Sequence, residues 1–102
     1  MEQDNFIWLQ NWYQSHCDGD WEHQNGVRLN TIDNPGWSLT ISLQDTELEG
    51  KKFKNLEINR SDSNWLFCAV RNNRFEGRCG CNNLEEILHI FRSWAGMAGL
   101  AH

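Results

Sequence analysis

The stretch "GVRLNTIDNPGWSLTISL", residues 26–43, decides the fold because it contains both strands and the turn of a β-hairpin. Apolar and hydroxyl residues alternate along its second half, which is the period of a strand with one buried face. The first half alternates in the same way through Val27, Leu29 and Thr31. Between the halves, Pro35 fixes φ and Gly36 tolerates positive φ, as a tight turn requires. The sequence therefore predicts two antiparallel strands with half-buried faces.

Three more strands follow the hairpin, separated by short polar turns. They are predicted at residues 53–60, 65–70 and 75–81. The segment 65–70, "WLFCAV", is apolar on both faces, which is typical of a strand inside a sheet rather than at its edge. The intervening loop, residues 44–52, is polar.

A helix is predicted at each end of the chain. Residues 4–16 have aromatic and apolar residues at helical spacing, and Asp4 or Asn5 can cap their N-terminus. Residues 82–94 carry apolar residues at i, i+3, i+4 and i+7 after a capping asparagine, Asn82 or Asn83. The small residues of the last segment, 95–102, predict a frayed tail.

These elements predict an α+β fold in which an antiparallel sheet of about five strands is flanked by an N-terminal and a C-terminal helix. A chain of 102 residues fits one domain, residues 1–102. It contains no apolar run of membrane-spanning length. Its acidic N-terminus lacks a secretory apolar segment, so a cytoplasmic protein without membrane contact is expected.

The charge of the chain is unevenly distributed. The formal net charge is −5. Residues 1–25 contain five acidic residues and no lysine or arginine, whereas nine acids and nine bases cancel from residue 26 onward. An acidic N-terminal quarter disfavours nucleic acid as a ligand and favours a basic partner.

Most of this charge lies in the loop "CDGDWEHQNG", residues 17–26, where Cys17, Asp18, Asp20, Glu22 and His23 are potential metal ligands or acid–base groups. A calcium loop would need a further acid at its far end, and none is present. A zinc site would need two more ligands from elsewhere in the chain. We therefore expect neither a metal nor a cofactor, and we keep a small metal-dependent hydrolase that uses residues 17–23 as the enzymatic alternative.

The cysteines offer little chemistry of their own. Cys79 and Cys81 could complete a zinc site, but two cysteines separated by one residue are an uncommon zinc spacing, and a strand holds them too far apart for an unstrained disulfide. The default for these two, and for Cys17 and Cys68, is a buried free thiol.

Nucleic-acid binding is a second alternative. Arg71, Arg74 and Arg78 cluster around one turn with Phe75 between them, and a basic surface with an aromatic residue can hold single-stranded nucleic acid. The acidic balance of the chain opposes this interpretation.

Trp21 stands among three charged residues of the acidic loop, and two roles fit it equally well. It could be an exposed aromatic anchor inside an acidic rim, since tryptophan is enriched at the centres of interfaces. It could instead fold back and plug the sheet.

The sequence also resembles a known family. The segments that carry the resemblance are "LQNWYQSHCDGDWEHQNGVRL" (9–29), "IDNPGWSL" (32–39), "TELEGKKF" (46–53), "NWLFCAV" (64–70) and "CGCNNLEEILHIFRSW" (79–94). Together they resemble the immunity 53 family of bacterial polymorphic toxin systems. The resemblance implies a non-enzymatic α+β protein that is made beside a secreted toxin and neutralises it. It supplies no catalytic residues and does not identify the toxin.

A toxin that cuts nucleic acid needs a basic surface, and an acidic surface can steer towards it and block it. We therefore expect Asp18, Asp20, Trp21, Glu22 and His23 to form part of the toxin-binding face, with help from the first helix. The rival hypothesis makes this loop structural, ties Glu22 or His23 to backbone groups, and places the interface on the sheet. The sequence leaves the oligomeric state open.

Overall fold

The computed structural model describes residues 4–99 of the chain. Helix α1, Asn5–His16, is capped as predicted, because Oδ1 of Asp4 accepts hydrogen bonds from the amides of Phe6 (2.7 Å) and Ile7 (3.2 Å). A short helix α2, Trp21–Gln24, follows within the segment predicted to be a loop. The strands are β1 Val27–Ile32, β2 Gly36–Ser42, β3 Leu56–Ser61, β4 Asn64–Arg71 and β5 Arg74–Cys79, and helix α3, Leu84–Gly99, comes last.

The five strands form one antiparallel sheet in the order β1-β2-β5-β4-β3, so the predicted α+β class is confirmed. The β1–β2 hairpin has the predicted pairing, with Leu29 opposite Leu39. Strand β4 is an interior strand as predicted, and β5, the last strand in sequence, occupies the centre of the sheet.

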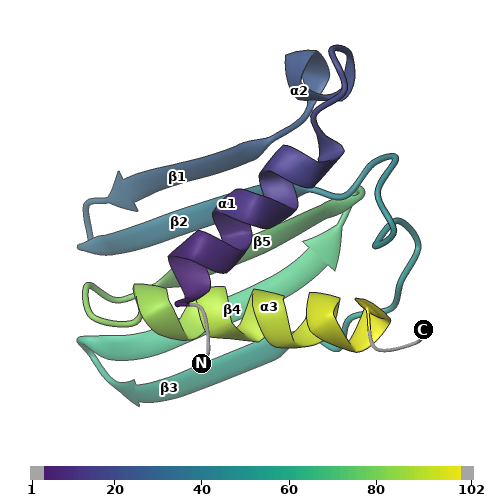
Figure 1. The fold of residues 1–102 in the computed structure, drawn as a ribbon. Coiled ribbons are helices and arrows are strands. Elements are labelled where there is room, and N and C mark those ends of the chain that lie inside the picture. Colours follow the sequence, from purple (N-terminus) through teal and green to yellow (C-terminus); the bar gives the residue numbers. More distant parts are fainter. Residues whose placement is uncertain (1–3, 100–102) are drawn as a thin grey trace.

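Helices α1 and α3 lie on the same face of the sheet, and the other face carries no helix (Figure 1). The core between the layers is aromatic, with Phe75 and Phe91 fully buried and their ring centroids 5.0 Å apart. Gly77 lets α3 approach β5 closely, since a Cβ at this position would stand 2.6 Å from Cγ2 of Ile87.

Three sequence predictions about strands and turns are wrong. Strand β1 is an exposed edge strand, and Leu29 and Thr31 on its predicted buried face are both exposed. Gly36 does not have positive φ; instead, it is needed because any side chain there would collide with the carbonyl group of Cys79. Strand β3 begins at Leu56 rather than at residue 53, although Phe53 still packs against the core.

Two predictions near the C-terminus also need correction. The last helix does not end at Trp94 but continues to Gly99, because Ala95 is still buried against the core. Residues 100–102 of the predicted frayed tail lie outside the described residues. Cys68 and Cys79 are buried free thiols as predicted, whereas Cys17 is only half-buried and Cys81, beyond β5, is exposed. Burial raises the pKa of Cys68 to about 12 and that of Cys79 to about 11. No helix within residues 4–99 is long and apolar enough to cross a membrane.

Candidate functional site

Trp21 is a core residue rather than an exposed anchor. Its side chain is only 6% exposed, and its Nε1–H donates a 2.7 Å hydrogen bond to the carbonyl oxygen of Gln44. Its ring packs against three rings of α1, with centroid distances of 6.3 Å to Trp12, 5.8 Å to Tyr13 and 5.5 Å to His16. The plug interpretation is therefore correct for this residue, and Trp21 cannot offer its indole to a partner.

Asp18 and Glu22 fold the acidic loop by accepting hydrogen bonds from its backbone. Oδ1 of Asp18 accepts hydrogen bonds from the amides of Asp20 and Trp21, both at 2.9 Å. These bonds satisfy backbone amides at the start of α2, as a capping side chain would. The carboxylate of Glu22 reaches back to the amides of Asp18 (3.0 Å) and Gly19 (2.9 Å). Gly19 has φ +96°, a conformation that favours glycine.

The backbone amides also make these two carboxylates more acidic. The amides of Trp21 and then Asp20 lower the pKa of Asp18. The pKa of Glu22 is lowered by its own amide and, to a smaller extent, by the amides of Asp18 and Gly19. The hypothesis that Glu22 is tied to backbone groups is therefore correct, while His23 has no such bond among the described residues.

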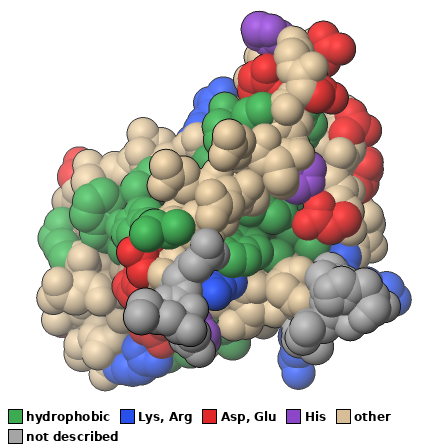
Figure 2. All heavy atoms as spheres, in the orientation of Figure 1, with side chains coloured by type: hydrophobic (Ala, Val, Ile, Leu, Met, Phe, Trp, Pro, Cys, Tyr) green, Lys and Arg blue, Asp and Glu red, His purple; other side chains and the backbone are tan. Residues whose placement is uncertain are grey.

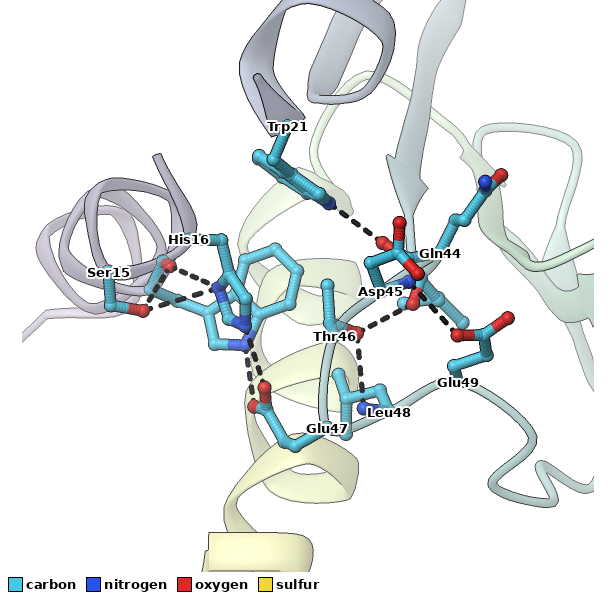
Figure 3. Close-up of polar contacts among 11 residues, drawn as sticks. Ser15, His16, Trp21, Gln44, Asp45, Thr46, Glu47, Leu48 and Glu49 are labelled. Carbon is cyan, nitrogen blue, oxygen red and sulfur yellow. Dashed lines mark hydrogen bonds and ion pairs between the residues drawn. The ribbon is translucent and has the colours of Figure 1, made fainter. Parts of the chain in front are cut away.

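A second acidic segment, residues 43–51, lies beside this loop, held there by the bond from Trp21 to Gln44 (Figure 3). Glu47 accepts hydrogen bonds from Nε1 of Trp12 (2.9 Å) and Nε2 of His16 (2.7 Å). Nδ1 of His16 lies 2.9 Å from the carbonyl oxygen of Trp12, so both ring nitrogens face oxygen acceptors.

The pKa of Glu47 reflects opposing effects. Partial burial acts to raise it, but the hydrogen bonds from Trp12, from its own backbone amide and from His16 outweigh burial, and the pKa is lowered. Glu47 is thus an ionised link between the 43–51 segment and helix α1.

Of the remaining acidic residues in this segment, Glu49 is hydrogen-bonded to the protein and Asp45 is not. Glu49 accepts hydrogen bonds from the amide of Asp45 (3.0 Å) and from Nδ2 of Asn73 (3.3 Å). Asp45 has a left-handed backbone with φ 61°, and its carboxylate has no hydrogen-bond partner among residues 4–99. The carboxylate of Asp20 is likewise unengaged within the described part of the chain, and both side chains are exposed.

Asp20 and Asp45 line one shallow hollow of about 380 Å³ at the end of the sheet that carries α2. Asp18 and His23 also line it, and no lysine or arginine does. Figure 2 shows a group of acidic side chains at this end of the molecule. We call it the acidic end and define it as residues 17–25 and 43–49.

Asp45 is the residue of this site that sequence reasoning missed. The nine acids and nine bases after residue 26 cancel in net charge, but they are not evenly mixed along the chain. An acidic run precedes a basic one: Asp45, Glu47 and Glu49, then Lys51, Lys52 and Lys54. That local separation was the available signal.

The structure does not assemble the alternative sites. Among residues 4–99, no group of three histidine, cysteine or acidic side chains is placed to hold a metal ion. Phe75, the aromatic residue of the nucleic-acid alternative, is fully buried, so it cannot stack on a base. Arg71 pairs with Glu76 at 2.9 Å.

Comparison with known families decides the class. Residues 6–96 match the sequence profile described as Immunity protein 53. The chain belongs to the immunity protein 53 family. Membership indicates an immunity, or antitoxin, role and implies binding of a cognate toxin. No curated protein and no solved structure matches the chain.

Proposed function

We propose that this member of the immunity protein 53 family neutralises its toxin by binding it in a stoichiometric complex, with the acidic end covering the toxin's active surface. The proposal rests on one observation. Asp20 and Asp45 come from separate segments, have unengaged carboxylates, and line the same hollow without any lysine or arginine beside them.

Unengaged surface carboxylates suit recognition better than the bonded ones do. Asp18, Glu22, Glu47 and Glu49 already accept hydrogen bonds from the protein, which hold the two segments in place. Asp20 and Asp45 can accept bonds from a partner's lysine or arginine without disturbing that framework. His23, exposed on the same hollow, would add a polar contact at the rim.

The charge pattern also predicts the class of toxin. An acidic hollow accelerates encounter with a basic surface and fixes its orientation. Nuclease domains hold phosphates with basic surfaces, so a nuclease is the class of toxin that fits best. The complex would block that surface by occupying it, with no bond made or broken by this chain.

The experiment is a binding titration and an association-rate measurement with the purified toxin domain encoded beside this chain. The test variant is Asp20→Lys combined with Asp45→Lys. The control is Glu57→Lys combined with Asp62→Lys, which changes the net charge equally at exposed positions of β3 and the turn after it, away from the acidic end.

We expect the test variant to associate at least about tenfold more slowly, with a weaker dependence of the rate on salt. The control should differ from the unmodified chain by less than about threefold. Equal losses for both variants would mean that only the overall charge matters, and no loss for the test variant would remove the acidic end from the interface.

A further inference from the structure

Helix α1 leaves an apolar groove open against strand β1. The groove has a volume of about 430 Å³, and Phe6, Leu9 and Tyr13 of α1 face Val27 and Leu29 of β1 across it. Phe6 is 46% exposed and Leu29 40% exposed. These two residues and Ile7 are the exposed large hydrophobic residues of the described chain. Two of the three therefore lie in one groove, which is unusual for a surface without a binding role.

The backbone beside the groove is also available for pairing. Strand β1 is at the end of the sheet, and within residues 4–99 it pairs only with β2. An edge strand presents unpaired amide and carbonyl groups along its outer side, and these can bind an extended segment of another protein as an additional strand. The groove then supplies a place for apolar side chains of that segment.

The groove is continuous with the acidic end. Asn25 lines both the groove and the hollow that contains Asp20 and Asp45. Tyr13, at the same end of the groove, packs against Trp21 of α2. An extended segment that runs along β1 would therefore have one end beside the carboxylates.

We propose that an extended segment of the cognate toxin adds to the sheet at β1, inserts apolar side chains into the groove between α1 and β1, and places a lysine or arginine at the acidic end. This inference rests on the proposed function and identifies the form of the recognised segment. A second copy of this chain is a poorer occupant, because each copy has a formal net charge of −5.

The substitutions that test the groove are Phe6→Ser and Leu29→Ser, measured separately by titration with the same toxin domain. The matched control is Ile7→Ser, since Ile7 is on α1 and is also 46% exposed, but it does not line the groove. All three side chains are exposed, so the fold should tolerate their replacement. We expect at least about tenfold weaker binding for each groove variant and less than about twofold for the control.

Amide hydrogen exchange separates strand addition from simple contact. In the complex, amides of Val27–Ile32 should exchange more slowly, while those of Leu56–Ser61 in β3 should not change. Unchanged exchange in β1 would overturn strand addition. Groove variants that bind as tightly as the unmodified chain would overturn the inference as a whole.

The outcomes also separate this inference from the proposed function. If the groove variants bind normally and Asp20→Lys with Asp45→Lys does not, the groove is excluded and the acidic end stands. If the unmodified chain does not bind the toxin, the proposed function fails. If light scattering shows a dimer that Leu29→Ser abolishes, the groove belongs to a second copy and the inference is wrong.

Discussion

The two edge strands, β1 and β3, end the same sheet, and each carries an arginine, but only β3 also has an irregular register with its neighbour. Its register with β4 shifts between Asn59 and Ser61, and Arg60 makes a paired hydrogen bond to the carboxylate of Glu86, at 2.7 and 3.0 Å. Strand β1 keeps a regular register with β2 from Val27 to Ile32. A bulge protects a sheet edge from unwanted pairing, so the regular edge at β1 is better suited to a partner than the irregular edge at β3.

The helices above the two edges differ in the same sense. Helix α3 packs closely, because Gly77 of β5 admits Ile87 and Asn83 joins α3 to β4 by accepting a 3.3 Å hydrogen bond from the amide of Trp65. Helix α1 faces β1 across the open groove. Helix α3 is thus packed tightly onto the sheet, whereas α1 leaves a groove beside β1.

Among these predictions, Trp21→Ala should cause the largest loss of stability, and the loss should be greatest in the acidic end. The indole is buried between α1, α2 and Gln44, and loss of a buried tryptophan lowers the free energy of unfolding by about 3–5 kcal/mol. Urea denaturation measures this decrease, and amide exchange should accelerate more in the acidic end than in β3. Ile7→Ala, at an exposed position, serves as the control. A decrease below about 1 kcal/mol would show that the acidic end does not depend on this indole.

Gly77→Ala tests the close packing of α3. The added methyl group would crowd Ile87, and overpacking of this kind lowers the free energy of unfolding by about 1–3 kcal/mol. Gly96→Ala, on α3 itself, is the control, because apart from its chain neighbours and the backbone of its own helix no described atom lies within 4 Å of the added Cβ. That control should stabilise the protein by about 0.5–1 kcal/mol, since alanine favours helix over glycine. Equal effects of both substitutions in thermal denaturation would contradict the close approach.

Asp18→Asn tests the internal bonding of the acidic end through its dependence on pH. The folded state lowers the pKa of Asp18, so this residue adds stability above its unfolded pKa, near 3.9, and that contribution is lost as pH falls through the lower folded value. The variant should be less stable at neutral pH and should lose less stability on acidification. The two chains should converge where the carboxyl group is protonated in both states. Parallel stability curves across the acid range would contradict the prediction.

Glu86→Gln should have the smallest effect. The side chains of Arg60 and Glu86 are 43% and 35% exposed, and solvent screening leaves exposed ion pairs with little net stabilisation. We expect a small decrease in melting temperature at low salt that disappears near about 1 M salt. A decrease that persists at high salt would show that the pair stabilises β3 as well as protecting its edge.

The sequence predicted the elements whose signals are local. Alternation in the 26–43 hairpin, the cap at Asp4 and the apolar face of the last helix all follow from neighbouring residues, and the structure confirms them. Strand β1 was predicted correctly, but the burial of its face was not, because alternation reports only which residues share a face. Whether a helix covers that face depends on how α1 lies above the sheet.

The candidate site was only partly predictable for the same reason. The acidic loop was evident from composition, but the burial of Trp21 depends on rings of α1 and on Gln44, which lies 23 residues away. Asp45 joins the site through that same contact. The sequence marks each acidic segment by its composition, but it does not show that the two segments lie side by side.

The cysteines have a practical consequence. Of the four, Cys81 alone is exposed, and the raised pKa values of Cys68 and Cys79 keep those thiols protonated at neutral pH. Cys81 follows β5, at the end of the sheet opposite α2 (Figure 1). Once Cys17, a half-buried free thiol in the acidic end, is replaced by serine, a maleimide fluorophore on Cys81 would sit at the end of the sheet away from the acidic hollow and could report toxin capture by energy transfer.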